Sequence, residues 1–227
     1  MLAVIAAAAE SPRLLPLTQG TPVSALEVGE QTLINHQIDA LNNAGIDNII
    51  VITGFCSEQV ESLCGKRATC HFNPFYATSH IAMNLWTVRH LLHNGFVMIY
   101  GDILFDESLV KEISFNKQSI VLGVDERGLD REAEKVSIME NEVTDIGKNI
   151  ESASAEFNGI AKISSTAYTI LEEVLKNISQ NDLGATFPDL IRYIIRREYP
   201  VTAHLTNQRW LDIDFPEDLE KARREWG

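Results

Sequence analysis

The sequence is short of basic side chains. Its 227 residues include 19 Lys and Arg against 32 Asp and Glu, which gives a formal net charge of −13. A protein that binds nucleic acid or an anionic membrane surface needs clustered Lys and Arg to displace counterions. We therefore expect neither nucleic acid nor a membrane as a partner, and any polyanionic ligand must be met by a few local cations.

Cysteines and long apolar runs are also scarce. Cys56, Cys64 and Cys70 are odd in number and lack zinc-site spacing, so they predict small buried thiols in a reduced compartment. The apolar opening, residues 1–9, has no basic segment before it, which favours a buried strand over a signal peptide. No run reaches the roughly 18 apolar residues of a membrane span. We expect a cytoplasmic protein, for which a homodimer stays open.

What the sequence does contain is an alternation of short apolar runs and helical patterns. Apolar residues recur three and four apart in the stretches that end at Gly45 and Gly95, as they do in amphipathic helices. Uninterrupted apolar runs are typical of parallel strands that are covered on both faces. We predict an α/β fold with a Rossmann-like, mostly parallel sheet flanked by helices. The expected strands are residues 2–6, 48–54, 68–73, 96–102 and 119–126.

The pattern changes after residue 130. Residues 135–150 read as two short strands around a Glu-Asn turn, and residues 157–164 read as a further strand. We predict a single domain over residues 1–227 with a small β-rich insert at about 130–165. The elements expected after the insert are helices at 165–178 and 186–197, a strand at 200–205 and a helix that starts after Pro216.

Gly101 and Asp102 end the fourth predicted strand. Open parallel sheets bind their ligands at this edge, outside the carboxyl ends of the strands. Glycine lets the backbone approach closely, and a carboxylate there suits Mg²⁺, which takes one or two carboxylates plus waters and phosphate oxygens. The alternative is that Asp102 only caps the turn that follows.

Asp212 and Asp214 form an acidic pair just before the last predicted helix. Residues two apart on an extended chain point to the same face, where two carboxylates repel each other unless a cation lies between them. Together with Asp102 they predict a shared metal site. The alternative is a solvated acidic strand end.

Three lysines are spread over the β-rich stretch. Lys135, Lys148 and Lys162 each lie beside apolar residues rather than in a charge run. In a chain with a strong acidic excess, such lysines could meet phosphates. Each is otherwise an ordinary solvated lysine.

Six stretches carry a family resemblance. They are PRLLPLTQGTP (12–22), NPFYATSHIAMNLW (73–86), GDILF (101–105), EKV (134–136), EFNGIAK (156–162) and WLDIDFPEDLEKA (210–222). Through them the chain, from Leu2 to about Arg224, resembles the nucleotidyltransferases that activate sugar phosphates. It is most similar to their small branch of phosphocholine and inositol-phosphate cytidylyltransferases. The resemblance implies the fold of the nucleotide-diphospho-sugar transferases.

The resemblance also implies a nucleotide loop after the first strand, in a modified form. The family uses a glycine-rich loop there, but this chain has Ala9 and Ser11 at glycine positions and Val23 where a lysine is usual. Glycine leaves room for a close phosphate, and a lost cation costs transition-state stabilisation. We expect the loop to border a nucleotide but to hold it differently. The nucleotide contacts implied are Ala7, Ala8, Ala9, Glu10, Ser11, Arg13 and Gly101.

The remaining roles rest on the same resemblance. Asp102 matches the family's first metal ligand, and Asp214, with Asp212 nearby, matches the second, which implies Mg²⁺ as the cofactor. The implied catalytic cations are Arg13, Lys135 and Lys148, of which the two lysines would supply the charge that Val23 cannot. The implied acceptor contacts are Tyr76, His80, Asn84 and Lys162.

The implied reaction is a Mg²⁺-dependent nucleotidyl transfer. An oxygen of a small phosphate or phosphonate acceptor attacks the α-phosphorus of CTP, or of another NTP, and pyrophosphate departs. Two alternatives stay open. One is a non-catalytic nucleotide-binding relative that lost the loop glycines and lysine, and the other is a sugar-1-phosphate nucleotidyltransferase that uses UTP or GTP.

Overall fold

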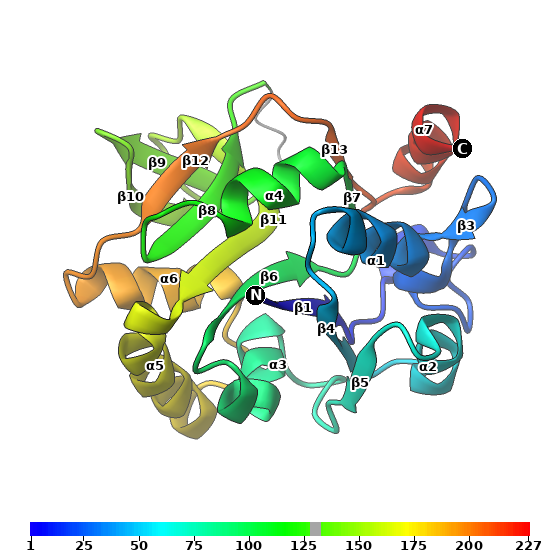
Figure 1. Ribbon diagram of the computed structural model, residues 1–227, viewed down its shortest axis with the longest axis horizontal. Helices are drawn as coiled ribbons and strands as arrows, with labels where there is room; N and C mark the ends of the chain where they lie inside the picture. The colour runs from blue at the N-terminus through cyan, green and yellow to red at the C-terminus, as the bar shows by residue number, and fades with distance from the viewer. Residues whose placement is uncertain (128–132) are drawn as a thin grey trace.

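The computed structural model describes residues 1–127 and 133–227 (Figure 1). The strands are β1 (Leu2–Ala7), β2 (Glu27–Val28), β3 (Gln31–Thr32), β4 (Asn48–Thr53), β5 (Thr69–Phe72), β6 (Gly95–Tyr100), β7 (Ile103–Phe105), β8 (Ile120–Asp125), β9 (Lys135–Met139), β10 (Glu142–Gly147), β11 (Ala155–Ser164), β12 (Thr202–Leu205) and β13 (Trp210–Asp212). The α-helices are α1 (Leu33–Asn43), α2 (Ser57–Cys64), α3 (Ile81–Val88), α4 (Glu107–Ser114), α5 (Tyr168–Asn181), α6 (Phe187–Arg196) and α7 (Pro216–Trp226). None of these helices is long and apolar enough to cross a membrane.

Within the described residues, nine strands form one sheet in the order β5-β4-β1-β6-β11-β8-β12-β10-β9. β1 lies parallel to β4 and β6, with Val4 opposite Ile50 and Met98. All five predicted strands are confirmed; β1, β4, β6 and β8 are largely buried, whereas β5, at the edge of the sheet, is partly exposed. The α/β fold is confirmed as well.

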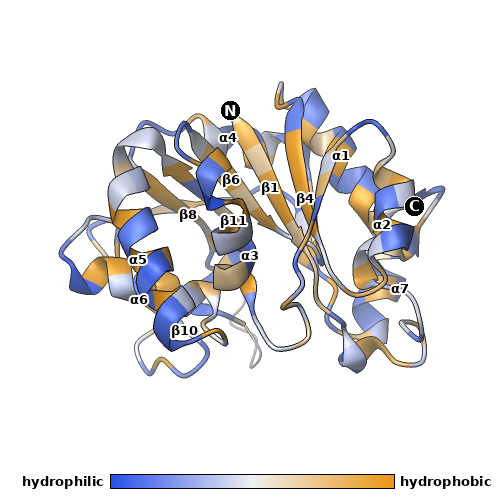
Figure 2. Cartoon of the chain, turned by 90° about the horizontal axis from the view of Figure 1, so that it is seen from below, coloured by the Kyte–Doolittle hydropathy of each residue, from blue (hydrophilic) through white to orange (hydrophobic). Residues whose placement is uncertain are grey.

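The sheet has a core layer on each face. Alternate side chains of β1 go to opposite sides, so that Val4 packs with α3, α5 and α6, and Ile5 packs with α1, α2 and α4. Figure 2 shows the apolar strands β1, β4 and β6 between these helices. Both faces of the sheet's parallel half are therefore fixed by packing, and the loops at its carboxyl edge extend from a well-packed base.

The structure corrects the limits of the predicted insert. β11 is a central strand, antiparallel to both β6 and β8, with Ala161 opposite Met98 and Leu122. Local alternation identifies a strand but not its partners, so the sequence alone placed this strand in the insert. β9 and β10 form one end of the same nine-stranded sheet, and residues 130–132 of the predicted insert lie outside the described part of the chain.

A third, smaller core joins three distant segments. Leu14 and Val23 from the loop after β1 pack with Leu104 of β7, Ile213 after β13 and Leu219 of α7. β7 and β13 pair antiparallel, with Leu211 opposite Leu104. This cluster brings the C-terminal acidic segment to the edge of the sheet where β1 and β6 end.

Candidate active site

A pocket of about 180 Å³ opens where β1 and β6 end. Its walls come from the alanines at the end of β1 and after it, the segment that leads into α3, the turn after β6, and residues beside β9 and at the start of α6. The chain therefore supplies the pocket from both halves. The sequence-predicted site residues that line it together are Ala8, Ala9, Tyr76, His80, Asn84, Gly101 and Asp102.

Gly101 is required by the close approach of β6 to β1. Its amide donates a hydrogen bond to the carbonyl oxygen of Ala6 at 3.1 Å. A Cβ at this position would lie 2.6 Å from that oxygen, which no side chain tolerates. The glycine thus allows the chain to turn at once into Asp102.

Asp102 lies beside the C-terminal aspartates. The amide of Ile213 donates to the carbonyl oxygen of Asp102 at 3.0 Å, and Asp212 is paired with Ile103 across the β7–β13 ladder. Oδ1 of Asp102 and Oδ1 of Asp212 are buried, and no hydrogen-bond donor among the described residues reaches either of them. The predicted convergence of these aspartates is therefore present.

Folding makes this acidic cluster electrostatically unfavourable. Burial, followed by repulsion from Asp214, raises the pKa of the Asp102 carboxyl to about 6. Burial and then the charge of Asp102 raise the pKa of Asp212 well above its ordinary value. Carboxylate oxygens without donors fit a hard divalent cation such as Mg²⁺, which also takes water and phosphate oxygens.

The described residues contain no group of three or more His, Cys, Asp or Glu side chains that could hold a metal ion by themselves. A cation here would therefore need ligands from its substrate in addition to the aspartates. Asp102 and Asp212 are the carboxylates with orphaned oxygens. Asp214 is instead engaged in an ion pair with Arg13.

Arg13 forms an ion pair with Asp214, with Nη1 3.2 Å from Oδ1. Its guanidinium also lies 5.7 Å from the centre of the Phe215 ring. The third core explains this meeting, because Leu14 and Ile213, the neighbours of these two residues, pack in the same cluster. Arg13, predicted as a catalytic cation, is thus ion-paired with Asp214, predicted as a metal ligand.

The rest of the alanine loop lies partly inside the protein. Ala7 and Ala8 are buried, and the Ala8 carbonyl accepts a hydrogen bond from the amide of Phe55. Ala9 and Glu10 are exposed, and the Ser11 carbonyl accepts from the Thr18 hydroxyl at 2.8 Å. Of these five, Ala8 and Ala9 reach the pocket.

Val23 explains the missing lysine in structural terms. Its side chain is only 6% exposed and packs in the third core with Leu14 and Leu26. A lysine with this orientation would bury its ammonium group among apolar side chains. Val23 therefore contributes a packing contact within the loop.

The three predicted lysines lie in different places. Lys148, which follows β10, is near enough to Glu134 to lower the pKa of that carboxyl. Lys135 begins β9 and is not among the described residues that line the pocket, whereas its neighbour Glu134 is. The structure therefore brings Lys148, but not the Lys135 side chain, toward the site.

Lys162 is a correction. It is 4% exposed, and its ammonium donates to the carbonyl oxygens of Asn116, at 2.9 Å, and Gln118. These carbonyls precede β8, at the sheet edge opposite the pocket, so Lys162 contacts no acceptor there. Its position beside apolar residues reflected a buried, internally bonded lysine.

The segment before α3 meets the prediction better. His80 is the exposed N-cap residue of α3, and Asn84 is buried in its second turn. The Asn73 side chain donates a hydrogen bond to Oδ1 of Asn84 at 2.7 Å, which fixes this part of the pocket wall. Tyr76 lies between them in the chain and completes the wall.

Sequence reasoning missed an acidic and aromatic side of the pocket. The Tyr100 hydroxyl donates to Oε2 of Glu134 at 2.8 Å, and Thr186 and Phe187 lie beside them. Burial raises the pKa of Glu134 to about 7 and that of Tyr100 well above its usual range. The available sequence signals are the EKV stretch, which contains Glu134, and Tyr100, the residue before Gly101.

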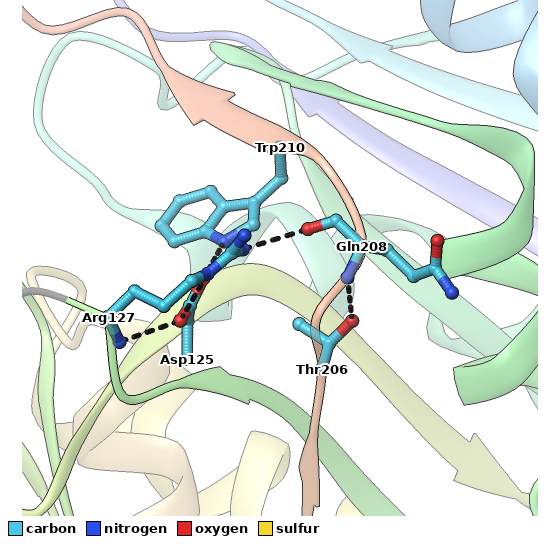
Figure 3. Close-up of polar contacts among 5 residues, drawn as sticks. All are labelled: Asp125, Arg127, Thr206, Gln208 and Trp210. Carbon is cyan, nitrogen blue, oxygen red and sulfur yellow. Dashed lines mark hydrogen bonds and ion pairs between the residues drawn. The ribbon is translucent and has the colours of Figure 1, made fainter.

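A polar network ties β13 to the end of β8 (Figure 3). Trp210 donates its indole N–H to Oδ2 of Asp125 at 2.7 Å. Arg127 binds both oxygens of the same carboxylate and also donates to the carbonyl of Gln208 at 2.9 Å. Burial would raise the pKa of Asp125, but these hydrogen bonds outweigh it and lower that pKa. The strand that carries Asp212 is anchored in this way.

This arrangement, an α/β sheet with a ligand pocket and acidic residues at the carboxyl ends of its strands, defines a protein with the nucleotide-diphospho-sugar transferase fold. Residues 2–122, just over half of the chain, match the sequence model of the family described as nucleotidyl transferase. The chain belongs to this nucleotidyl transferase family.

Relatives of known name are cytidylyltransferases and related transferases. The chain is 26% identical over 228 residues to the bifunctional IPC transferase and DIPP synthase of Aquifex aeolicus, covering 98% of this chain but 51% of that protein. It is 22% identical to the CTP:phosphoglutamine cytidylyltransferase of Campylobacter jejuni, covering 97% and 98%. A choline-phosphate cytidylyltransferase of Streptococcus pneumoniae is 36% identical over 106 residues, 46% of each chain. The chain thus spans about half the length of the first of these, whereas the match to the third covers about half of each protein.

Two solved structures have the same fold. The CTP:phosphocholine cytidylyltransferase of Streptococcus pneumoniae superposes with a TM-score of 0.78 at 23% identity, over 99% of this chain and 98% of that one. The inositol-1-phosphate CTP transferase of T. maritima gives 0.79 at 22% identity, over 99% and 96%.

Proposed function

We propose that this protein transfers CMP from CTP to a small phosphorylated alcohol or phosphonate and releases pyrophosphate. The observation that carries the proposal is the pocket itself, which joins the loop after β1, the Tyr76–Asn84 segment and Asp102 in one cavity. The names of three relatives, all of them transferases and two of them cytidylyltransferases, support the reaction class.

The chain's own residues would act by positioning and charge. Backbone and side chains of Ala8 and Ala9 border the nucleotide, and Arg13 and Lys148 are the cations near enough to face phosphate oxygens. The Tyr76 to Asn84 wall orients the acceptor so that its oxygen faces the α-phosphorus. Mg²⁺ bound to Asp102 and Asp212 or Asp214 would supply positive charge beside the triphosphate.

A second candidate function has structural support of its own. Val23 is buried in a core, and Arg13 is held by Asp214, so the two cations that the family's loop would direct at phosphate are absent or engaged. A protein in this state can bind a nucleotide without transferring it. The alternative is therefore a nucleotide-binding, non-catalytic member of the family.

Pyrophosphate release separates the two candidates. The protein would be incubated with MgCl₂, each of the four NTPs in turn, and a panel of phosphorylated alcohols, phosphonates and sugar 1-phosphates. We expect release with CTP and a small acceptor, and a loss of roughly 100-fold or more in Asp102→Asn. Asp39→Asn, a change on the exposed side of α1, serves as the matched control. CTP binding without pyrophosphate from any acceptor would favour the non-catalytic candidate.

A further inference from the structure

Gln37 is a polar residue on the buried face of α1. It is only 1% exposed, and its neighbours on that face, Ile34, Ile38 and Leu41, are fully buried. An amide in an apolar layer is unfavourable unless hydrogen bonds replace the water that it loses. Oε1 of Gln37 is buried and has no hydrogen-bond partner among the described residues. Packing of α1 alone therefore does not explain a glutamine at this position.

The amide nitrogen of Gln37 has a specific role in the fold. Nε2 donates hydrogen bonds to the carbonyl oxygens of Tyr100, at 2.8 Å, and Ile103, at 2.7 Å. A side-chain amide has two N–H hydrogens, so both donors are used. The two carbonyls flank Gly101 and Asp102, which form the turn between β6 and β7. A side chain of α1, the helix that packs against β7 (Figure 1), thus bridges both ends of this turn.

Backbone groups hold the residues within the turn. The Gly101 amide donates a hydrogen bond to the carbonyl oxygen of Ala6 at 3.1 Å. The Ile213 amide donates to the carbonyl oxygen of Asp102 at 3.0 Å. The turn is therefore bonded to β1, to α1 and to the segment after β13. Among these contacts, that of Gln37 comes from a side chain, so a substitution can remove it.

The Asp102 carboxylate depends on the position of this turn. Its Oδ1 is buried and has no hydrogen-bond partner among the described residues. The direction of this oxygen is therefore set by the backbone that carries it. Residues that orient a metal ligand without touching the metal typically contribute roughly 10- to 100-fold to metal affinity.

We propose that Gln37 is a positioning residue for the metal site, because it binds the carbonyls on both sides of Asp102 and so holds this carboxylate toward Mg²⁺ and the nucleotide. The inference rests on the Mg²⁺ site of the proposed function and adds to it a residue of the protein core. Gln37 is not among the described residues that line the pocket. It acts through Asp102 and touches neither substrate.

Gln37→Met tests this role, because methionine has a similar length and no hydrogen-bond donor. Isothermal titration calorimetry would measure the Kd of CTP with MgCl₂ and, separately, with EDTA, in the absence of any acceptor. We expect MgCl₂ to tighten CTP binding to the wild-type protein. In Gln37→Met we expect this gain to shrink about 10-fold, while the Kd with EDTA changes less than about 2-fold.

Ile38→Val is the matched control, since Ile38 lies on the same buried face of α1. The control removes one buried carbon and leaves the hydrogen bonds of the turn in place. An equal loss of CTP affinity with MgCl₂ and with EDTA in Gln37→Met would limit Gln37 to folding and overturn the proposal. The same reduction of the Mg²⁺ gain in Ile38→Val, or a wild-type protein without any such gain, would also overturn it.

A double-mutant cycle tests whether Gln37 acts through Asp102. Gln37→Met should reduce the Mg²⁺ gain about 10-fold in the wild-type background and less than about 2-fold in the Asp102→Asn background. Equal effects in both backgrounds would contradict a route through Asp102. Gln37→Asn, which is one methylene shorter and keeps a polar amide, replaces Gln37→Met if that variant does not fold, and the same outcomes apply to it.

These binding measurements are independent of turnover, because no acceptor is present. A Mg²⁺ gain that requires Gln37, in a protein that releases no pyrophosphate, would refute the transferase proposal alone. Pyrophosphate release by the wild-type protein, together with an unchanged Mg²⁺ gain in Gln37→Met, would refute the positioning role alone.

Discussion

Asp102 shows how a single residue of the candidate active site can lower the folding stability of the protein. Its Oδ1 is buried without a hydrogen-bond donor among the described residues, and its pKa is raised to about 6 from an ordinary 3.8. A raised carboxyl pKa means that the folded protein above this pH holds a charge that the unfolded chain would keep in water. The aspartate is therefore retained at the expense of folding stability, which is what a binding site for a cation requires.

Asp102→Asn should stabilise the ligand-free protein. Above about pH 6 the substitution removes the penalty, by roughly 1–2 kcal/mol at pH 7, and the gain should vanish as the pH falls below 3.8, where both states are protonated. Urea unfolding with EDTA at several pH values measures it, with Asp39→Asn as reference. A variant less stable than wild type at pH 7 would contradict this account of the carboxylate.

Glu134 and Lys162 show why a residue type alone does not assign a role. Glu134 precedes β9 and Lys162 lies within β11, yet Glu134 lines the pocket and Lys162 bonds two carbonyls at the far edge of the sheet. Each role depends on a partner that is distant in the chain, 34 residues away for Glu134 and Tyr100. The sequence shows the residue, but only folding chooses its partner.

At the scale of secondary structure, β13 has a function that its three residues do not suggest. It pairs with β7 and places Asp212 beside Asp102, although the like charges of these aspartates push the strands apart. The Asp125, Arg127 and Trp210 network opposes that repulsion by fixing the first residue of β13 to the end of β8 (Figure 3). Asp212, which we propose as a metal ligand, is thus held in place by residues outside the site.

Trp210→Phe tests this tether, because phenylalanine keeps an aromatic ring and loses the indole N–H. We expect the MgCl₂ concentration for half-maximal activity to rise about 3-fold to 10-fold, equivalent to the loss of one charge-assisted hydrogen bond, with the acceptor KM nearly unchanged. Trp226→Phe on α7 is the matched control. An unchanged MgCl₂ requirement together with a lower melting temperature would limit Trp210 to stability.

The net charge of the whole molecule, −13, has the same sign as the nucleotide that the site is proposed to bind. The substrates proposed for this protein include an anionic nucleotide, which must approach a surface of the same sign. The local cations Arg13 and Lys148 act at short range, whereas the surplus carboxylates act over the whole surface. Long-range repulsion should therefore slow substrate encounter.

Added salt should consequently raise activity at low substrate. Between about 20 mM and about 200 mM KCl the screening length shortens from roughly 20 Å to under 10 Å, which weakens like-charge repulsion. We expect kcat/KM for CTP to increase by about 2-fold or more while kcat changes little. Steady-state kinetics with MgCl₂ in fixed excess over CTP measures it. A steep fall with KCl would mean that a local basic field, rather than the net charge, governs encounter.

The sequence by itself determined the strands, the α/β class and the position of Asp102 at a strand end. These follow from patterns within a few residues, since apolar runs and helical periods record which faces will be buried. It also determined the family, through stretches such as GDILF and WLDIDFPEDLEKA, in agreement with the match over residues 2–122. Local chemistry and local periodicity were sufficient for all of these.

Only the tertiary structure decided which residues meet. It placed β11 between β6 and β8, paired Arg13 with Asp214 and brought Glu134 to Tyr100. It also turned Val23 and Lys162 inward. The reason is physical: these contacts join segments tens to hundreds of residues apart, and their energies depend on burial and charge that exist only after the sheet and its core layers have assembled.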